Sequence, residues 1–230
     1  MSKGVRRAAV FAALAVAVVV QAHWDQIHEA LGFGGPSKAQ AAQQLGVRVV
    51  DARPRARDYR RSAFGEAWTD DTDAPDGHNG CDTRDDVLNR DLIHKQYVST
   101  RRCPQAVAVG DLHDPYTGQW VHFQRGKDSS AKVQIDHIVP LAYAWDMGAK
   151  NWDPALRRRF ANDPANLIAV DGGANEDKGD QPPGQWMPKE RAFGCSYARQ
   201  FAAVARGYGL AVDARSAKVI AQTLRTCPSA

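Results

Sequence analysis

Asp136 and His137 stand side by side in the stretch VQIDHIVPLAYAW, where most neighbouring positions are apolar. Asn166, Asn175 and Lys178 follow, with Lys178 three residues after Asn175. A carboxylate and a carboxamide supply the hard oxygen atoms that bind Mg²⁺ or Mn²⁺, and a neutral imidazole can accept a proton. Together these residues could hold one divalent cation beside a base and a positive charge. An isolated Asp-His pair also has a plainer interpretation, in which Asp136 caps a turn and His137 is a hydrogen-bonded core residue.

Two strands and a short helix would bring these residues together. The sequence predicts a strand over residues 133–139, a second in NLIAVD at 166–171, and one or two helical turns in ANEDKGDQ at 174–181. On a regular strand Asp136 and His137 face opposite sides, but the apolar phase of the first strand switches at this point. We therefore expect a β-bulge or a strong local twist at Asp136 and His137.

The rest of the chain predicts a single α+β domain. A hairpin is expected over residues 107–125, because alternating apolar and polar residues flank the turn sequence HDPYTG. A short helix is expected in SKAQAAQQLG, capped by Ser37, and a two-piece helix in AYAWDMGAKNWDPALRRRF, its second piece opened by Asp153. Residues 196–224 have helix-like spacing that is interrupted at GYGL.

Charge is distributed unevenly before the hairpin. Residues 48–61 hold six arginines against two aspartates, and residues 62–91 hold nine acidic residues against two arginines, Arg84 and Arg90. We interpret the two stretches as mutually paired surface or as a docking region. Arg84 and Arg90 are expected to pair with nearby aspartates. In the same region, Phe64 and Trp68 are expected to be core anchors.

The first 22 residues differ from all that follow. Three basic residues precede an apolar run at 8–20, and the tripeptide VQA at 20–22 suits a signal peptidase. We interpret residues 1–22 as an export signal and residues 23–44 as a flexible lead-in with a short helix. A permanent membrane anchor is the alternative, although the run is shorter than the ~20 apolar residues that span a bilayer. Cleavage would remove three of the 30 basic residues and none of the 26 acidic ones, so composition alone gives no case for nucleic-acid binding.

The cysteines agree with export. All four lie after the predicted signal, and none belongs to a C-x-x-C pair of the kind found in zinc sites. We expect two disulfides, and of the three possible connectivities we favour the pairing of near neighbours in sequence. Each would close a loop worth about 3 kcal/mol in the chain-entropy model. The predicted pairs are Cys81 with Cys103 and Cys195 with Cys227.

The sequence resembles the HNH, or ββα-metal, endonucleases. DHIVP, followed by Asn166, Asn175 and Lys178, is similar to the variant in which aspartate replaces the first histidine of the motif and asparagine the last. That variant occurs in the CRISPR RNA-guided nucleases and in the C-terminal HNH family of GmrSD-like restriction enzymes. The resemblance to secreted bacterial members of the second group extends over roughly residues 45–200, through FGEAWTD, GCDTRDDVLNRDL, DPYTG, FANDPANLIAVDG and KGDQPPGQWMP.

The resemblance implies a nuclease domain over residues 45–230, with its motif core at 131–190. It implies His137 as the general base that activates water, and one divalent metal ion, Mg²⁺ or Mn²⁺, on Asp136 and Asn175. Asn166 would brace the loop between the two halves of the motif. Lys178 would reach a phosphate oxygen, with a solvated surface lysine as the alternative. The basic residues that could contact the substrate backbone are Arg157, Arg158, Arg159 and Arg125.

The expected protein is thus a secreted, monomeric, metal-dependent endonuclease of low sequence specificity, without stable membrane association after cleavage. DNA is the expected substrate and RNA the other option. Two alternatives remain open at this point: an extracellular binding protein that keeps the fold without activity, and a nuclease effector neutralised by a partner inside its producer. The 208 residues that would remain after cleavage leave little room for the delivery domain of such an effector.

Overall fold

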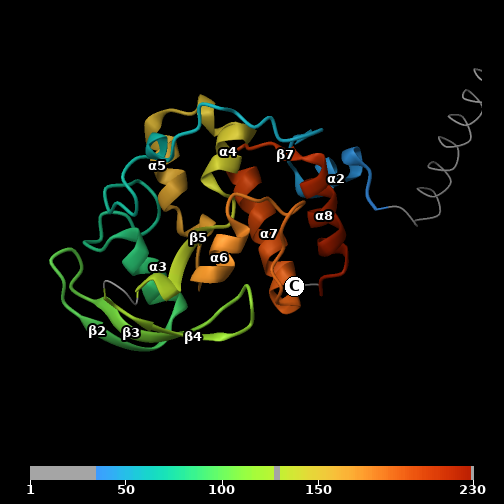
Figure 1. Cartoon of the computed structure of the whole chain (residues 1–230). Coiled ribbons are helices and arrows are strands. Elements are labelled where there is room, and N and C mark those ends of the chain that lie inside the picture. The colour runs from blue at the N-terminus through green and yellow to red at the C-terminus, as the bar shows by residue number, and fades with distance from the viewer. Residues whose placement is uncertain (1–34, 127–129, 229–230) are drawn as a thin grey trace, which may run out of the picture.

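Two antiparallel strands and a helix form the centre of the molecule. The computed structural model describes residues 35–126 and 130–228. Within them, β5 (Val133–His137) pairs with β6 (Leu167–Asp171). The Asp171 side chain then accepts a hydrogen bond from the backbone of Ala174 and caps α6 (Gly172–Lys178). The predicted strand-strand-helix order is present, and β5 and α6 lie side by side in Figure 1.

The predicted bulge in β5 is wrong. The pairing runs without a register shift from Val133 opposite Asp171 to His137 opposite Leu167. The small sheet is covered on both faces: Ile135 packs into one hydrophobic cluster with side chains of the helix α3 (Thr83–Asp91), whereas Val170 packs into a second cluster formed mainly by helices. A strand that is buried on both faces needs no strict alternation of apolar and polar residues. The change of apolar phase therefore reflects burial and not an extra residue inserted in the strand.

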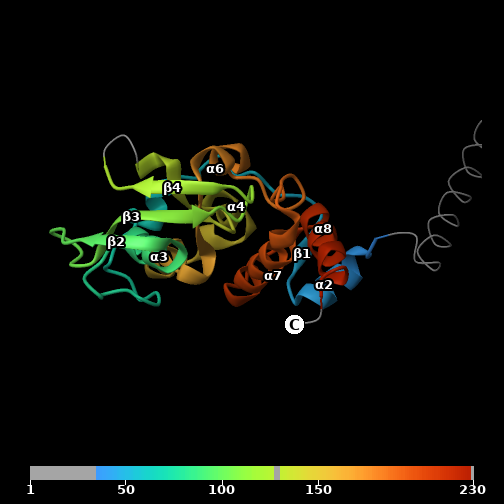
Figure 2. The ribbon, with the colours of Figure 1, turned by 90° about the horizontal axis from the view of Figure 1, so that it is seen from below.

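The remaining elements form an outer sheet on one side and a helical cluster on the other (Figures 1 and 2). In chain order they are α2 (Lys38–Leu45), β1 (Val49–Val50), η1 (Arg61–Phe64), α3 (Thr83–Asp91), β2 (Ile93–Val98), β3 (Ala106–His113), β4 (Trp120–Gln124), η2 (Ser130–Lys132), α4 (Leu141–Met147), η3 (Ala149–Asn151), α5 (Pro154–Asn162), η4 (Pro164–Asn166), α7 (Arg191–Gly207), β7 (Val212–Asp213) and α8 (Ala214–Arg225).

Several local predictions are confirmed. Ser37 and Gln40 form a capping box at the start of α2, and Gly46 ends that helix in a left-handed conformation. Asp153 accepts a hydrogen bond from the backbone of Leu156 and starts α5. The hairpin is β3 with β4, and the tail forms two helices, α7 and α8. The α+β class predicted from the sequence is therefore the class of this fold.

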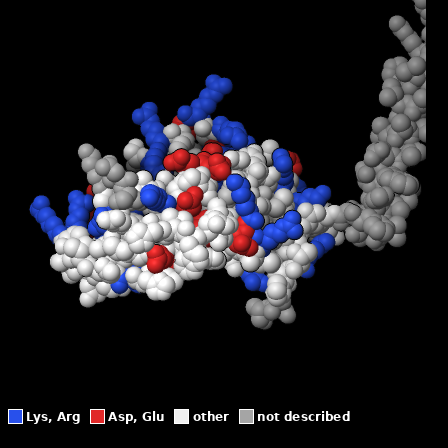
Figure 3. Space-filling view, turned by 60° about the horizontal axis from the view of Figure 1, so that its bottom comes forward, with Lys and Arg blue, Asp and Glu red and all other residues white. Residues whose placement is uncertain are grey.

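The outer sheet has the order β2-β3-β4 and packs one face on α3 and the central strands. Its other face carries few charged side chains in Figure 3. Among the described residues, four large apolar side chains are exposed, and all belong to β2 or β4. They are Ile93, Tyr97, Val98 and Trp120.

Two disulfides connect segments that are close in sequence. Cys81 pairs with Cys103, and Cys195 pairs with Cys227, which confirms the predicted connectivity. Each bond closes a loop of moderate length and so reduces the entropy of the unfolded chain. Among the described helices, none is long and apolar enough to cross a membrane. The predicted export signal at 1–22 lies outside the described residues.

Candidate active site

Three of the predicted site residues, all from the strand-strand-helix unit, line one hollow of about 430 Å³. Asp136 and His137, at the end of β5, and Asn175, on α6, all line it. We call this the Asp136 hollow. Asp136 and His137 are each only 6% exposed, so they reach the hollow through small exposed portions. The arrangement offers oxygen donors and an imidazole to a ligand in one cavity.

Lys178 and Tyr116 hold the Asp136 carboxylate in place. Lys178 Nζ lies 3.0 Å from Asp136 Oδ1 and 2.9 Å from Oδ2, and it also donates to the backbone carbonyl of His137 at 2.9 Å. The Tyr116 hydroxyl donates a short hydrogen bond to Asp136 Oδ2. Tyr116 and Lys178 are both fully buried. Hydrogen bonds from an ammonium and a hydroxyl fix the orientation of this buried side chain.

The fully buried position of Lys178 decides between the two predictions for this residue. A solvated surface lysine is wrong, because the side chain is 0% exposed. Its three hydrogen-bond donors already face oxygen atoms of Asp136 and His137. The geometry therefore favours a lysine that positions Asp136 over a lysine that contacts phosphate directly.

The His137 ring is fixed by one hydrogen bond and one stacking contact. Its Nε2 lies 2.9 Å from the backbone carbonyl oxygen of Ala161. Because a carbonyl can only accept, Nε2 carries the proton, and Nδ1 is the basic atom of the neutral ring. The Trp68 ring stacks on His137 with 5.4 Å between ring centroids and an interplanar angle of 13°.

The environment also keeps the His137 imidazole neutral. Burial lowers its pKa to about 3, and the positive charges of Arg61 and Lys178 act in the same direction, while the bond with the Ala161 carbonyl opposes them. At neutral pH the ring therefore carries no charge. A neutral imidazole with a free Nδ1 can accept a proton from water.

Asn166 joins the two halves of the unit. Its side-chain oxygen accepts from the backbone of Val139 at 2.8 Å, its side-chain nitrogen donates to the Val139 carbonyl at 3.3 Å, and its backbone carbonyl accepts from Ile138 at 2.8 Å. Asn166 is 0% exposed. These bonds fix the chain just after His137 to the chain just before β6, as expected of a bracing residue.

Asn175 and Asp136 carry oxygen atoms of the kind that bind a hard divalent cation. Asn175 Nδ2 donates to Gln134 Oε1 at 2.8 Å, and within the described residues the Asn175 side-chain oxygen makes no hydrogen bond. The Asp136 oxygens keep lone pairs beyond the bonds from Lys178 and Tyr116. No group of three His, Cys, Asp or Glu side chains in the described part of the chain could hold a metal ion. A cation here would therefore use one carboxylate, one carboxamide and oxygen atoms of water or substrate, a set that suits Mg²⁺ or Mn²⁺.

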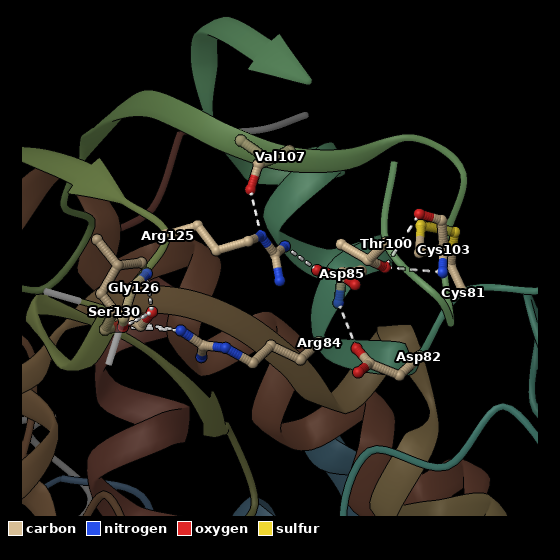
Figure 4. Close-up of polar contacts among 11 residues, drawn as sticks. Cys81, Asp82, Arg84, Asp85, Thr100, Cys103, Val107, Arg125, Gly126 and Ser130 are labelled. Carbon is tan, nitrogen blue, oxygen red and sulfur yellow. Dashed lines mark hydrogen bonds and ion pairs between the residues drawn. A yellow bond between two sulfur atoms is a disulfide. The ribbon is translucent and has the colours of Figure 1, made fainter. Parts of the chain in front are cut away.

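The arginines predicted to contact substrate do not line the Asp136 hollow. Arg125 is ion-paired with Asp85 and donates to the carbonyl of Val107 at 2.8 Å (Figure 4). Arg157 donates to the carbonyls of Ala63 and Trp152. The partners of Arg125 and Arg157 are thus protein groups.

The other two predicted contacts stay open to solvent. Arg158 has a long ion pair with Asp71 at 3.8 Å, and Arg159 is exposed on α5. Their contact with a substrate backbone stays a prediction.

One of the two ion-pair predictions for the acid-rich stretch is wrong. Arg90 pairs with Asp91, at 2.6 Å. Arg84 instead donates to the backbone carbonyl of Ser130 (Figure 4) and to that of Val133. Burial lowers the pKa of Arg84. Carbonyl oxygen atoms, and not a carboxylate, satisfy this half-buried guanidinium.

Three residues of the site were missed or misjudged in the sequence. Tyr116 lies in the turn of the hairpin and reaches Asp136 only in the folded chain. Trp68 packs against the core, as expected, but it is only half-buried, and its stacking on His137 was not foreseen. Arg61 also lines the Asp136 hollow, is exposed, and makes no side-chain hydrogen bond or ion pair with the described residues. Only the arginine-rich composition of residues 48–61 pointed toward Arg61.

Comparisons with known proteins agree with the motif. Residues 82–223 match the family model described as GmrSD restriction endonucleases, C-terminal domain. A protein of the fungus Arthroderma benhamiae, described as an uncharacterized secreted protein, is 37% identical over 150 residues, which cover 64% of this chain and 68% of that protein. No solved structure matches the chain.

Proposed function

We propose, from the premise that the chain belongs to the family of GmrSD restriction endonuclease C-terminal domains, that it is a secreted, metal-dependent endonuclease. Family membership supports a nuclease-type hydrolase acting on nucleic acid. The observation that carries the proposal is the joint placement of Asp136, His137 and Asn175 on one hollow. The two disulfides and the relative described as secreted support an extracellular location.

In this proposal His137 is the general base. Water attacks the phosphorus of a phosphodiester, and its proton passes to His137 Nδ1 while the bond between phosphorus and the 3′ oxygen breaks. The Ala161 carbonyl holds Nε2–H, so that Nδ1 faces the reacting water with its lone pair. Trp68 keeps the ring plane from turning. General-base catalysis of this kind contributes typically about 10²–10⁴-fold in rate.

Asp136 and Asn175 would hold the divalent cation. When bound, the cation would neutralise charge on the scissile phosphate and on the leaving oxygen. Lys178 and Tyr116 keep the Asp136 carboxylate oriented, and Asn166 keeps the chain after His137 in register with β6. We propose DNA as the main substrate with little sequence preference, and the protein as a monomer.

Plasmid cutting tests this proposal. The protein comprising residues 23–230, with both disulfides formed, should nick and linearise plasmid DNA in Mg²⁺ or Mn²⁺ and stop in chelator. A parallel RNA substrate sets the preference between nucleic acids. If well-folded protein cuts neither nucleic acid in either metal, the proposal fails and an inactive binding protein with this fold takes its place.

A further inference from the structure

His137 also lines a second hollow. It has a volume of about 250 Å³, and we call it the Trp68 hollow. Its wall is mostly apolar, and its apolar lining residues include Phe64, Trp68, Leu141 and Ala161. Arg61 and Glu66 are its charged, exposed residues. Such a wall is unsuited to a phosphate group but suited to a flat, apolar-faced ring with polar edges.

We propose that the Trp68 hollow binds one unpaired nucleobase next to the scissile phosphate. The inference rests on the proposed nuclease function and adds a substrate class to it: the enzyme prefers single-stranded or locally unpaired nucleic acid. The next three observations support the assignment.

The first observation is that the two hollows share a wall. His137, Leu141 and Arg61 line both of them. A phosphate beside His137 in the Asp136 hollow therefore has the Trp68 hollow as its immediate neighbour. Arg61 adds an exposed guanidinium without a protein partner in the described chain, at the boundary where a phosphate oxygen would lie.

The second observation concerns size and chemistry. A volume of 250 Å³ corresponds to roughly eight water molecules at ~30 Å³ each, which is room for one planar heterocycle. Aromatic and apolar walls bind the faces of all four bases, because every base has a π-face. The hollow thus fits a base contact with little sequence preference.

The third observation is the backbone of Trp68. Its φ of +58° lies in the left-handed region that an aromatic residue rarely adopts. The conformation is held because the Trp68 carbonyl accepts from the backbone of Thr83 at 3.2 Å, and the Thr83 hydroxyl donates to the Thr69 carbonyl at 3.1 Å. A rare conformation that is fixed to α3 directs Trp68 onto His137 and into the hollow.

A base inside a duplex could not use this hollow. Its faces are covered by neighbouring base pairs, so it would have to leave the stack before it entered. A single-stranded base has no such cost. The preference for unpaired nucleotides follows from this difference.

The test combines a substrate change with a protein change. The substrate is a short single-stranded DNA whose central linkage is its one ordinary phosphodiester, the others being phosphorothioates. Three versions of this strand are used: one keeps all its bases, and the other two each lack the base on one side of the central bond. The protein change is Ala67→Trp, which fills the Trp68 hollow from an exposed position that does not line the Asp136 hollow.

For the wild-type protein, removal of the base on one side of the central bond should lower kcat/KM by about tenfold or more. A hairpin duplex of the same sequence should be cut more slowly by a similar factor. Ala67→Trp should lose about tenfold on the intact strand and lose no more when that base is removed, because both changes eliminate one contact. Ala155→Trp, on the exposed face of α5 away from both hollows, should cut every substrate as wild type does.

Equal cutting of intact and abasic strands by wild type would overturn the base hollow and leave the nuclease proposal standing. The same holds if base removal lowers kcat/KM of Ala67→Trp by the same further factor as it lowers that of wild type. Cutting of the intact strand by His137→Ala at the wild-type rate would instead overturn the nuclease proposal at this site. The wild-type comparison of intact and abasic strands needs no variant, so the outcome is decided even if Ala67→Trp fails to fold.

Discussion

Asp136 beside His137, and Asp111 beside His94 and His122, are two arrangements of the same side-chain types in one molecule. Asp111 lies on the outer face of the three-stranded sheet, where His122 Nδ1 and His94 Nδ1 contact its two oxygens at 2.8 and 3.1 Å. These two histidine side chains are more than half exposed. Hydrogen bonds from His122 and His94 lower the pKa of Asp111.

The two Asp-His arrangements differ in how deeply the protein buries them. Around Asp136 and His137 the protein excludes water, fixes the imidazole through Ala161, and supplies Lys178 to the carboxylate. Around Asp111 the same types of side chain face solvent, which screens their interaction. An Asp-His neighbourhood therefore has catalytic potential only where burial fixes the tautomer, the charge and the direction of each group.

The largest contrast is expected in activity. His137→Ala should lower the rate of plasmid cutting by about a hundredfold or more, because it removes the base. His122→Ala, the matched change on the outer sheet, should cut at the wild-type rate. Initial rates of nicking under the same metal concentration measure both. Equal losses in the two variants would mean that the buried histidine has no special role.

The second contrast is expected in stability. Lys178→Met leaves the Asp136 carboxylate buried without its ammonium partner, which should lower the free energy of unfolding by about 3–5 kcal/mol. Lys189→Met removes an exposed lysine that lies 3.6 Å from Asp177 and should change it by less than about 0.5 kcal/mol. Denaturant unfolding in chelator measures both variants. A small effect of Lys178→Met would show that the buried pair contributes little.

Much of the strand-strand-helix unit and of the elements around it could be predicted from the sequence, because the patterns that specify them involve residues close together along the chain. Caps such as Ser37 and Asp153, the turn chemistry of the hairpin and the spacing from Asp136 to Lys178 depend on neighbours along the chain. The disulfide pairing followed from the same preference for near neighbours. These signals were sufficient to place Asp136, His137 and Asn175 on one hollow.

The rest depended on contacts between distant segments. Tyr116 meets Asp136 across 20 residues, and no local pattern marks a turn tyrosine as a partner of a carboxylate. Lys178 was expected near a phosphate or in solvent because lysine is rarely buried without a partner, and that partner became visible only in the fold. The false bulge had the same origin, since burial of both faces of β5 depends on two clusters from other parts of the chain.

Two buried tyrosines sharpen the role of Asp136 further. Tyr116→Phe removes a hydrogen bond to a charged group and should lower the free energy of unfolding by about 1.5–3 kcal/mol, with slower cutting. Tyr197→Phe is the matched control, because the Tyr197 hydroxyl is buried and has no hydrogen-bond partner in the described structure. That variant should be neutral or slightly more stable. The same destabilisation from both would assign the effect to packing and not to Asp136.

Asp86 is a partly buried carboxylate, and its substitution should have the smallest effect on stability. Burial raises its pKa to about 6, Asn79 opposes this through a hydrogen bond, and Asp76, Asp70 and Asp82 reinforce it. The folded state therefore binds the Asp86 proton more tightly than the unfolded state, so this contribution to stability is present below pH ~4 and is lost as the pH rises to about 6.

Asp86→Asn should remove that part of the pH dependence and stabilise the protein above pH 6. Because the side chain is partly exposed, the gain should be no more than about 1 kcal/mol. Unfolding measured between pH 4 and 8, with and without the substitution, shows the difference. A curve for Asp86→Asn parallel to that of wild type would contradict the raised pKa.

The dependence of cutting on Mg²⁺ concentration tests most directly whether the Asp136 hollow is a metal-dependent active site. Asn175→Ala removes an oxygen ligand together with the hydrogen bond to Gln134. Gln134→Ala removes that hydrogen bond and a long one to Glu176, at 3.5 Å, but leaves the Asn175 oxygen in place. If the metal binds here, Asn175→Ala should need about tenfold or more Mg²⁺ for half-maximal cutting. Gln134→Ala should need a Mg²⁺ concentration close to that of wild type. An unchanged Mg²⁺ dependence in Asn175→Ala would contradict the assignment of the metal to this hollow.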